Sequence, residues 1–418
     1  MDKFIIEGGH TLTGDVHISG AKNAVLPIMA ASLLWPDRYV LHNVPDLRDT
    51  HTMAHLLEII GASISFEAGS MQIDTTACRN PEAPYELVKT MRASFYVLGP
   101  LLARFGKCRV SLPGGCNWGP RPVDLHLKAI ESLGASISLD SGYILAEGRL
   151  RGATIDFDIR SVGATGNALM AAVLAEGETI LTNAAEEPEI TALAYFLQKM
   201  GAQIEGIGTS TLHVRGQKEL HGTEDEIVAD RIEAGTFLIA GALAGDGVRI
   251  AGVCEDHLTL VLHKLEATGT ELRRRDGLIE VSRAAEIHPV DIVTTPYPGY
   301  PTDLQAQWIA LMTQADGSCI VQDNIYRDRF AHVPELIRLG AQIRLEGNAV
   351  TVLGPTELIG APVMSTDIRA SASLVLAALA AQGTSEISRV YHLDRGYEAF
   401  EKKLAGLGAH IERVPASL

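Results

Sequence analysis

The feature that most constrains the fold of this 418-residue chain is a short phrase that occurs six times, at intervals of 67–73 residues. In each copy an apolar helical pattern ends at Gly and an alternating pattern follows, as in "LEIIGASISF" at 57–66. Gly can adopt the left-handed conformation that ends a helix without a Cβ penalty. Ile64 and Phe66 then share one face of a strand, and Ser63 and Ser65 share the other. The six glycines are Gly61, Gly134, Gly201, Gly269, Gly340 and Gly408.

A second recurring phrase lies between these copies and consists of a small-residue apolar helix, a turn and a strand. Examples are "LMAAVLAEGETILTNA", "LIAGALAGDGVRIAGV" and "LVLAALAAQGTSEISRV". These helices are apolar on most sides, so we expect them to be buried. A period near 70 residues is too long for solenoid or propeller arrays, whose repeats span roughly 20–50 residues. Six units divide most simply into two similar α/β domains of three units each, with helices inside and sheets outside.

The composition limits the class of protein. Apolar residues make up 46% and charged residues 21% of the chain, which is typical of a soluble globular protein. The net charge of −16 argues against nucleic acid as a partner. The beginning of the chain lacks a signal-peptide pattern, and no apolar run approaches the length of a membrane span. The five cysteines show no CxxC pairing, so we expect neither disulfides nor a zinc site, and a reduced, cytoplasmic setting.

A glycine-rich loop carries the most unusual cysteine. In "SLPGGCNWGPRPVDLH" (111–126), Cys116 follows two glycines and Arg121 lies five residues later. A glycine-rich loop leaves the thiol accessible, and a nearby guanidinium lowers the pKa of a thiol. Cys116 is therefore a candidate reactive residue. A single exposed cysteine can equally be inert, which we expect of the other four: Cys78, Cys108, Cys254 and Cys319.

Charged and polar residues near turns form a second group of candidates. A lone Arg or Lys before a helix is often only a solvated helix end, and Asp303 and Asp367 could be plain N-caps. Ser161 could be a helix entry or part of a phosphate-binding turn. The tripeptide Arg-Ala-Ser occurs at 92–94 and at 369–371, as if two repeats present an arginine at equivalent helix starts. Several fixed cations inside an acidic protein would suit a small anionic ligand.

Taken together, the segments resemble the enolpyruvyl transferase family that acts on UDP-N-acetylglucosamine. The resemblance covers essentially the whole chain and rests on the joint occurrence, in this order, of "GAKNA", "MRAS", "PGGC…RPVDLH", "SVGAT", "DRIEAGTF", "YPGYPTDLQAQ", "RFAHVPEL", "DIRASASLV" and "HLDRGYE". It implies a two-domain inside-out α/β barrel built from six βαβαββ repeats, three per domain. One domain would comprise residues 20–229 with the Cys116 loop, and the other residues 1–19 and 230–418.

The resemblance also implies a reaction and its catalytic residues. The family moves the enolpyruvyl group of phosphoenolpyruvate onto the 3′-hydroxyl of UDP-N-acetylglucosamine and releases phosphate, by addition and then elimination. Cys116, on a loop that closes over phosphoenolpyruvate, would be the proton donor and the residue that fosfomycin alkylates. Asp303 would take the proton of the sugar hydroxyl. Lys22, Arg121 and Arg395 match the contacts to phosphoenolpyruvate and phosphate.

Other positions match binding contacts of the family. Arg92 and Arg369 would lie near the anionic groups, Asn23 would hold the sugar hydroxyl, and Asp367 would be a second carboxylate in proton handling. No cofactor or metal is implied, and no cluster of metal ligands is evident in the sequence. The remaining contacts, to the nucleotide and the sugar, are assigned to Arg121, Pro122, Val123, Asp124, Leu125, Ser161, Val162, Gly163, Ile325, Tyr326 and Arg329.

Some positions depart from the family pattern, and two alternatives remain open. Asn117-Trp118, Arg48, Tyr96, Arg327 and Gly166 stand where other residues are familiar. The 3-phosphoshikimate 1-carboxyvinyltransferases share the fold and the donor but lack the loop cysteine and the "RPVDLH" segment. A non-catalytic repeat scaffold would not need this set of charged residues. The sequence does not determine the oligomeric state.

Overall fold

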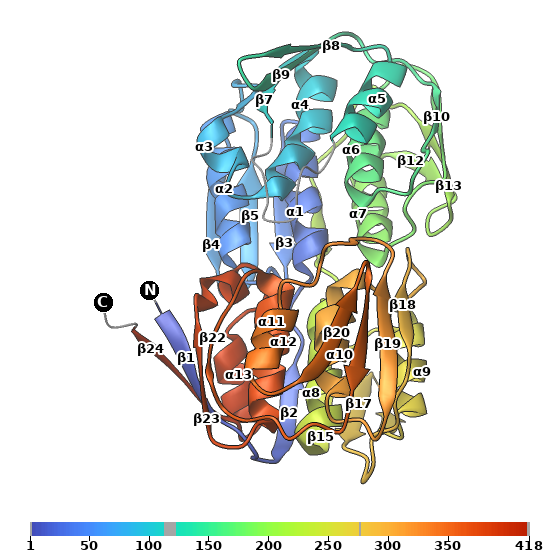
Figure 1. The fold of residues 1–418 in the computed structure, drawn as a ribbon. Helices are drawn as coiled ribbons and strands as arrows, with labels where there is room; N and C mark the ends of the chain where they lie inside the picture. Colours follow the sequence, from blue (N-terminus) through green and yellow to red (C-terminus); the bar gives the residue numbers. More distant parts are fainter. Residues whose placement is uncertain (1, 113–122, 276, 416–418) are drawn as a thin grey trace. The chain divides into compact units, whose positions relative to one another are not determined.

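The computed structural model describes residues 2–112, 123–275 and 277–415. The chain divides into two compact units (Figure 1). Unit 1 comprises Met1–Ser19 and Ala229–Leu418, and unit 2 comprises Gly20–Val228. The second crossing between the units therefore falls one residue before the boundary that we expected, 229/230.

The described residues form six four-stranded sheets, which all have the same topology. In each sheet the first two strands, in spatial order, are parallel, and the two that follow are antiparallel to their neighbours. Unit 2 contains the sheets β14 (Glu224–Glu226), β3 (Arg38–His42), β5 (Ser70–Asp74), β4 (Ser63–Glu67); β6 (Glu82–Ala83), β7 (Lys107–Ser111), β9 (Tyr143–Glu147), β8 (Ser136–Asp140); and β10 (Thr154–Asp156), β11 (Glu178–Thr182), β13 (Thr211–Arg215), β12 (Gln203–Glu205).

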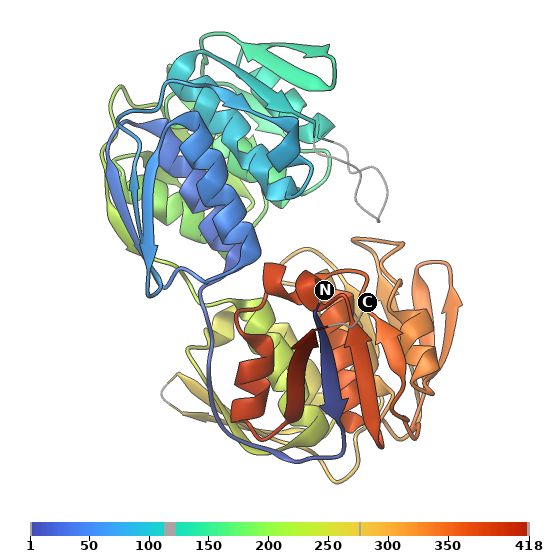
Figure 2. The ribbon, with the colours of Figure 1, turned by 90° about the vertical axis from the view of Figure 1, so that its left-hand side faces the viewer.

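Unit 1 contains the other three sheets, and two of them include strands from the beginning of the chain. β1 lies between β23 and β24 (Figure 2). β2 is the edge strand beside β15. The sheets are β2 (Leu12–His17), β15 (Gly245–Ala251), β17 (Leu278–Ser282), β16 (Glu271–Arg275); β18 (Ile292–Thr294), β19 (Ser318–Asp323), β21 (Ala349–Leu353), β20 (Gln342–Glu346); and β22 (Pro362–Met364), β23 (Thr384–Ser388), β1 (Asp2–Glu7), β24 (His410–Pro415).

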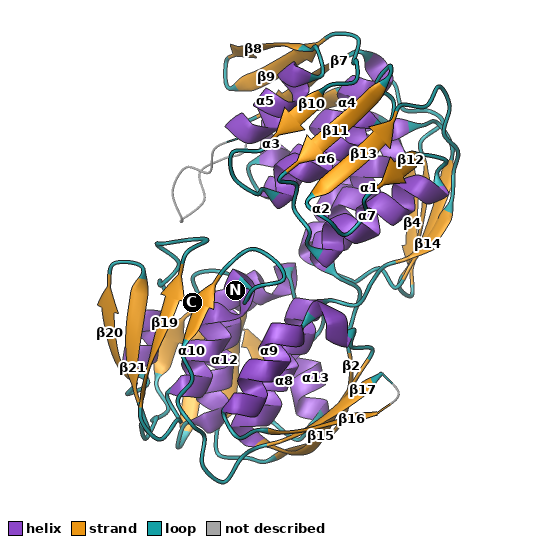
Figure 3. Cartoon of the chain, turned by 90° about the vertical axis from the view of Figure 1, so that its right-hand side faces the viewer, coloured by secondary structure: helices purple, strands orange, loops and turns teal. Residues whose placement is uncertain are grey.

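The inner helices of each unit are buried nearly all round, and the sheets lie outside them (Figure 3). Ala, Gly and Ser on these helices let their backbones approach closely, as in α12, where every residue from Arg369 to Leu379 is buried. This arrangement confirms the predicted inside-out α/β fold. The inner helices are α1 (Lys22–Ala31), α4 (Leu98–Phe105), α6 (Val162–Ala172), α8 (Arg231–Ala244), α10 (Gln305–Met312) and α12 (Ile368–Ala380).

The outer helices end at the repeated glycines. All six of these glycines have positive φ, between 87° and 114°. The following residue closes the end of the helix, as where Ala62 N donates to Leu57 O at 2.9 Å. The prediction from the repeated phrase is thus confirmed. These helices are α2 (Arg48–Ile60), α5 (Asp124–Ser132), α7 (Pro188–Lys199), α9 (Thr259–Ala267), α11 (Val333–Arg338) and α13 (Phe400–Gly406); a short α3 (Tyr85–Val88) precedes α4.

Each unit has its own hydrophobic core. The core of unit 1 gathers around α8, α10 and α12, and that of unit 2 around α1, α4 and α6. Among the described residues, no helix combines the length and the apolar character that crossing a membrane requires.

Candidate active site

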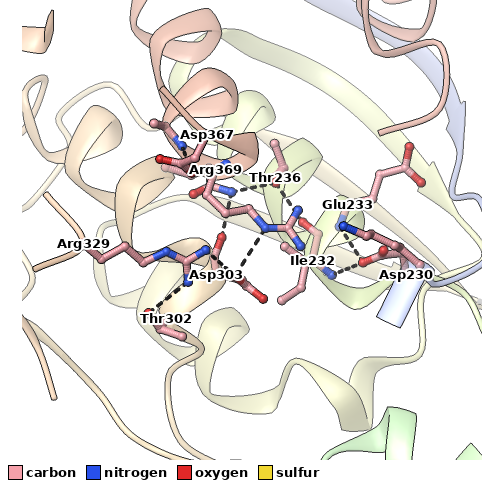
Figure 4. Close-up of polar contacts among 12 residues, drawn as sticks. Asp230, Ile232, Glu233, Thr236, Thr302, Asp303, Arg329, Asp367 and Arg369 are labelled. Carbon is pink, nitrogen blue, oxygen red and sulfur yellow. Dashed lines mark hydrogen bonds and ion pairs between the residues drawn. The ribbon is translucent and has the colours of Figure 1, made fainter. Parts of the chain in front are cut away.

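The centre of the candidate site in unit 1 is the carboxylate of Asp303. This residue lies in a 3₁₀ turn, Thr302–Leu304, directly before α10. Its Oδ1 is 2.6 Å from Nη2 of Arg329 and 3.4 Å from Nε of Arg369 (Figure 4). Burial disfavours the ionised carboxyl, but the two guanidinium groups outweigh it and hold the pKa of Asp303 well below its usual range. The N-cap interpretation is wrong here, because α10 has no side-chain cap.

Arg329 is positioned through the buried carboxylate of Asp323 at the end of β19. Nη1 of Arg329 donates to Thr302 Oγ1 at 3.1 Å, and that hydroxyl donates to Asp323 Oδ2 at 2.7 Å. The other oxygen of Asp323 accepts from the backbone N–H groups of Ile325 and Tyr326 at 2.9 and 2.8 Å. One buried acid therefore fixes three residues that we predicted for the sugar side of the site.

Asp367 is the N-cap of α12. Its Oδ1 accepts from the backbone N–H groups of Arg369 and Ala370 at 2.9 and 3.1 Å, and its Oδ2 accepts from Thr366 Oγ1 at 3.3 Å. The N-cap interpretation is thus confirmed for this residue. The predicted role of Asp367 in proton handling remains a prediction, and any such role would have to coexist with the cap.

The guanidinium of Arg369 lies against a buried polar network. Its Cζ is 5.3 Å from the centre of the Tyr397 ring. The Tyr397 hydroxyl is 2.9 Å from Thr236 Oγ1 and accepts from Gln307 Nε2 at 3.1 Å. Burial raises the pKa of Tyr397, so its hydroxyl stays protonated. Thr236 of α8 and Gln307 of α10 thus hold the tyrosine against which Arg369 of α12 packs.

The N-terminus of α8 adds a further cation to this part of unit 1. Asp230 caps the helix by accepting from Ile232 N at 2.7 Å and Glu233 N at 3.1 Å. Arg231, the first residue of α8, is among the cations that lower the pKa of Asp303. Arg395, another predicted anion contact, is the last residue of the 3₁₀ turn Val390–Arg395 in the same unit.

In unit 2, Lys22 is a buried lysine with a buried carboxylate partner. Its Nζ lies 2.6 Å from Oδ2 of Asp49, and the two side chains are only 11% and 3% exposed. Lys22 and Asn23 are the first two residues of α1, and Asp49 belongs to the first turn of α2. The alternative that Lys22 is a solvated helix end is therefore wrong.

The predicted nucleotide segments of unit 2 lie against each other through His126. A Cβ atom on Gly163 would lie 2.9 Å from Cε1 of His126, so only glycine fits there without a shift. Asn167 Nδ2 donates to His126 Nδ1 at 2.9 Å, and burial, with a smaller contribution from Arg92, lowers the pKa of His126 to about 3. Ser161 is the N-cap of α6, accepting from Ala164 N at 3.3 Å. Val123, Asp124 and Leu125 precede His126 at the start of α5, and His126 contacts Gly163 at the start of α6.

Tyr96 explains one departure from the family pattern, the glycine at position 166. A Cβ atom on Gly166 would lie 2.8 Å from Cε1 of Tyr96, so the tyrosine ring occupies the space that a larger residue at 166 would need.

Cys116, Arg121 and Pro122 fall outside the described residues, as do Asn117 and Trp118. Of the other cysteines, Cys78, Cys108 and Cys319 are buried and Cys254 is exposed.

Sequence reasoning missed several residues that position the site. Asp49, Asp323, Thr236 and Tyr397 were not selected, although Tyr397 follows Arg395 closely within "HLDRGYE". Arg231 stands in "DRIEAGTF", which contributed to the resemblance without a role for the arginine. Thr236 stands in the same motif, again without a role, whereas no local pattern marks Asp323, whose importance depends on its contacts in the folded chain.

The structure is thus that of a two-unit α/β protein in which cationic side chains hold carboxylates in place. Comparisons with known proteins identify its family. The family model of EPSP synthase (3-phosphoshikimate 1-carboxyvinyltransferase) matches residues 6–404. The UDP-N-acetylglucosamine 1-carboxyvinyltransferase of Chlorobaculum parvum is 55% identical over 99% of this chain and 98% of its own length. The protein of the same name from Geobacter metallireducens is 53% identical over 99% of this chain and 100% of its own.

Solved structures give the same result for the fold. The enolpyruvyl transferase NikO from Streptomyces tendae superposes with a TM-score of 0.91 at 27% identity, over 100% of this chain and 99% of that chain. EPSP synthase from Acinetobacter baumannii has a TM-score of 0.77 at 18% identity, over 99% of this chain and 100% of that chain, and supports the fold alone. The chain belongs to the enolpyruvyl transferase family, among the UDP-N-acetylglucosamine 1-carboxyvinyltransferases.

Proposed function

We propose that this protein transfers the enolpyruvyl group of phosphoenolpyruvate to the 3′-hydroxyl of UDP-N-acetylglucosamine and releases phosphate. The observation that carries the proposal is the Asp303 carboxylate held by Arg329 at 2.6 Å and Arg369 at 3.4 Å. It occurs in a chain whose full-length relatives carry the name of that activity. This reaction is the first committed step of peptidoglycan synthesis, and it uses nucleotide and phosphoester substrates of the cytoplasm.

The reaction requires an acid and a base. During addition, C3 of phosphoenolpyruvate gains a proton while the sugar oxygen bonds to C2; during elimination, C3 loses a proton and phosphate leaves C2. We assign the donor to Cys116 and the acceptor of the hydroxyl proton to Asp303. Asp367 is the second carboxylate for proton handling, and its Oδ1 already accepts two backbone N–H groups.

The charge around Asp303 suggests how substrate controls its basicity. With two guanidinium partners the carboxylate is ionised but a weak base, because its pKa is held low. A substrate phosphate or carboxylate competes for Arg329 and Arg369 by bidentate hydrogen bonds. When a substrate anion occupies the arginines, the pKa of Asp303 rises, and the carboxylate becomes a better proton acceptor.

The remaining assignments follow the chemistry of the substrates. Phosphoenolpyruvate carries a carboxylate and a phosphate, which fixed cations bind. We assign these groups to Lys22, Arg121 and Arg395, with Arg92 and Arg369 nearby. Asn23 would bind the sugar hydroxyl. The nucleotide and sugar contacts are those of Arg121, Pro122, Val123, Asp124, Leu125, Ser161, Val162, Gly163, Ile325, Tyr326 and Arg329.

One assay tests the proposal against its rival. Phosphate release from phosphoenolpyruvate is measured with UDP-N-acetylglucosamine and, separately, with shikimate 3-phosphate as acceptor. We expect release only with the sugar nucleotide. Release only with shikimate 3-phosphate would assign the protein to the other branch of the family, and no release with either acceptor would support a non-catalytic scaffold.

A further inference from the structure

Three side chains with metal-ligand chemistry lie together in unit 1, and the proposed transfer reaction does not use them. Within the described part of the chain, Glu7, His10 and His410 are the group of three whose ligand atoms all lie within 4.8 Å of one another. Glu7 ends β1, His10 lies in the turn before β2, and His410 begins β24. From the sequence we expected no ligand cluster. Glu7 and His410 stand at opposite ends of the chain, so their proximity appears only in the fold.

Strand pairing brings Glu7 and His410 together. β1 and β24 are antiparallel neighbours, and Glu7 is the register partner of His410 (Figure 2). Glu7 Oε2 lies 3.3 Å from His410 Nδ1, and Glu7 Oε1 lies 3.8 Å from His10 Nε2. The two imidazole rings stack with their centres 3.6 Å apart. The carboxylate thus faces one nitrogen of each ring.

The turn that carries His10 is fixed by the C-terminal end of α12. Gly8 N donates to Gly383 O at 3.0 Å, and Gly9 N donates to Leu379 O at 2.9 Å. A Cβ atom on Gly8 would lie 2.1 Å from Ala381 O, so no larger residue fits this close approach. The position of His10 is therefore set by the fold, as a preorganised ligand requires.

We propose that Glu7, His10 and His410 bind one divalent transition-metal ion of the zinc type. Two imidazoles and a carboxylate are donors that such ions prefer. Metal–ligand bonds of about 2.0–2.2 Å in a tetrahedron separate the ligand atoms by roughly 3.3 Å. One ligand atom from each of the three residues lies within 4.8 Å of the others, so the group has to contract when it binds the ion. The two stacked imidazoles, whose planes differ by 24°, have to turn out of the stack so that the lone pairs of both rings meet at the ion, and water completes the coordination.

The surroundings of His10 suit a bound cation. His10 lines a cavity of about 360 Å³ with Leu243 and Ala244 at the end of α8 and Leu379 and Ala380 at the end of α12. Helix C-termini carry partial negative charge and favour cations. Asp246 adds a carboxylate to the same lining and Arg283 a positive charge, so the cavity walls are not uniformly negative. Of the three proposed ligands, His10 is the one that lines this cavity.

A metal ion at this position would join the first and last strands of unit 1. Glu7 and His410 are 403 residues apart in sequence, and the ion would bind both only when β1 is paired with β24. A ligand that binds the folded state and not the unfolded state raises stability by mass action. The site is thus a stabilising clamp on the chain ends.

Full-length protein without an affinity tag tests the proposal. Zn²⁺ is titrated by calorimetry, and Co²⁺ serves as a spectroscopic probe whose thiolate charge-transfer band would reveal binding to a cysteine instead. The variants are H10Q and H410Q. The matched control is H42Q, because His42 also faces one carboxylate, Glu224 at 2.6 Å, and within the described residues this pair belongs to no group of three ligands.

We expect one Zn²⁺ per chain, a Co²⁺ spectrum without a thiolate band, and a rise in the thermal midpoint on adding Zn²⁺. H10Q and H410Q should weaken binding by at least about tenfold and abolish the rise, while H42Q should change neither. Circular dichroism checks that the variants fold. The proposal would be overturned by the absence of saturable binding, by a thiolate band, or by Zn²⁺ affinities of H10Q and H410Q equal to that of the wild type. Phosphate release is measured in parallel, so that failure of the transferase assignment is seen separately.

Discussion

Nζ of Lys22 lies 2.6 Å from Oδ2 of Asp49, and both side chains are almost fully removed from solvent. Burying a lysine is costly unless a carboxylate is close, so the first turn of α2 makes the cation at the start of α1 possible. Asp49 is accordingly a positioning residue for Lys22, which we propose as a contact to phosphoenolpyruvate. The same ion pair therefore contributes to the stability of unit 2 and to the binding of this substrate.

Replacing Asp49 by Asn should therefore destabilise the protein by about 3 kcal/mol, because it removes the charge from one partner of a buried pair. Urea unfolding measures the loss. The variants D49N, K22M and the double variant form a cycle that isolates the coupling between the two residues. A coupling energy near zero would contradict the importance of the pair.

The two arginines around Asp303 predict a pH effect. Removing one cation favours the neutral carboxyl, so R329Q should raise the pKa of Asp303. The acid limb of the kcat/KM profile should then move to higher pH than in the wild type. R344Q is the control, since Arg344 is exposed on β20 of the same unit. An unchanged profile in R329Q would show that Asp303 does not limit the reaction at acid pH.

The two interpretations of Asp367 can be separated by one pair of variants. Asn caps a helix about as well as Asp, so D367N should keep the wild-type stability, whereas D367A should lose about 1 kcal/mol. If Asp367 handles protons, kcat should fall by about 10²–10⁴-fold in both variants. Full activity in D367N would leave the residue a helix cap only.

The sequence predicts those parts of the fold that depend on local chemistry. Gly61 and its five counterparts have positive φ because a helix that ends before a strand needs a left-handed residue, and glycine supplies it locally. Likewise, the burial of α6, α8 and α12 follows from their small apolar side chains. The predicted repeats and the inside-out fold rest on these two patterns.

Long-range partners could not be predicted in the same way. Nothing near Asp323 indicates that it fixes Ile325, Tyr326 and, through Thr302, Arg329. The pairing of Glu7 with His410 requires the knowledge that β1 lies beside β24. The sequence therefore proposes residue types for the site, whereas their partners and charge states depend on the fold.

Fosfomycin tests the assignment of Cys116 as the reactive thiol. We expect fosfomycin to inactivate the wild type and to form one covalent adduct, which peptide mass spectrometry locates at Cys116. The variant C116S should not be labelled. Burial raises the pKa of Cys108 and Cys319 to about 12, which makes both poor nucleophiles. Cys254 is exposed and serves as the internal control for accessibility. An adduct at Cys254 with full loss of activity would contradict the assignment.

His126 predicts how the stability of the protein changes with pH. Burial lowers its pKa to about 3, against about 6.5 in the unfolded chain, so between these values only the unfolded state binds the proton. The contribution of His126 to stability is complete above pH 6.5 and is lost as the pH falls towards 3, by at most about 1.4 kcal/mol per pH unit. In H126Q this dependence is absent, so the stability difference between wild type and H126Q should shrink as the pH falls. Urea unfolding from pH 7 to pH 4.5 measures the difference, with H42Q as the control at a partly exposed histidine. A difference that stays constant over this range would show that His126 is not held neutral in the native state.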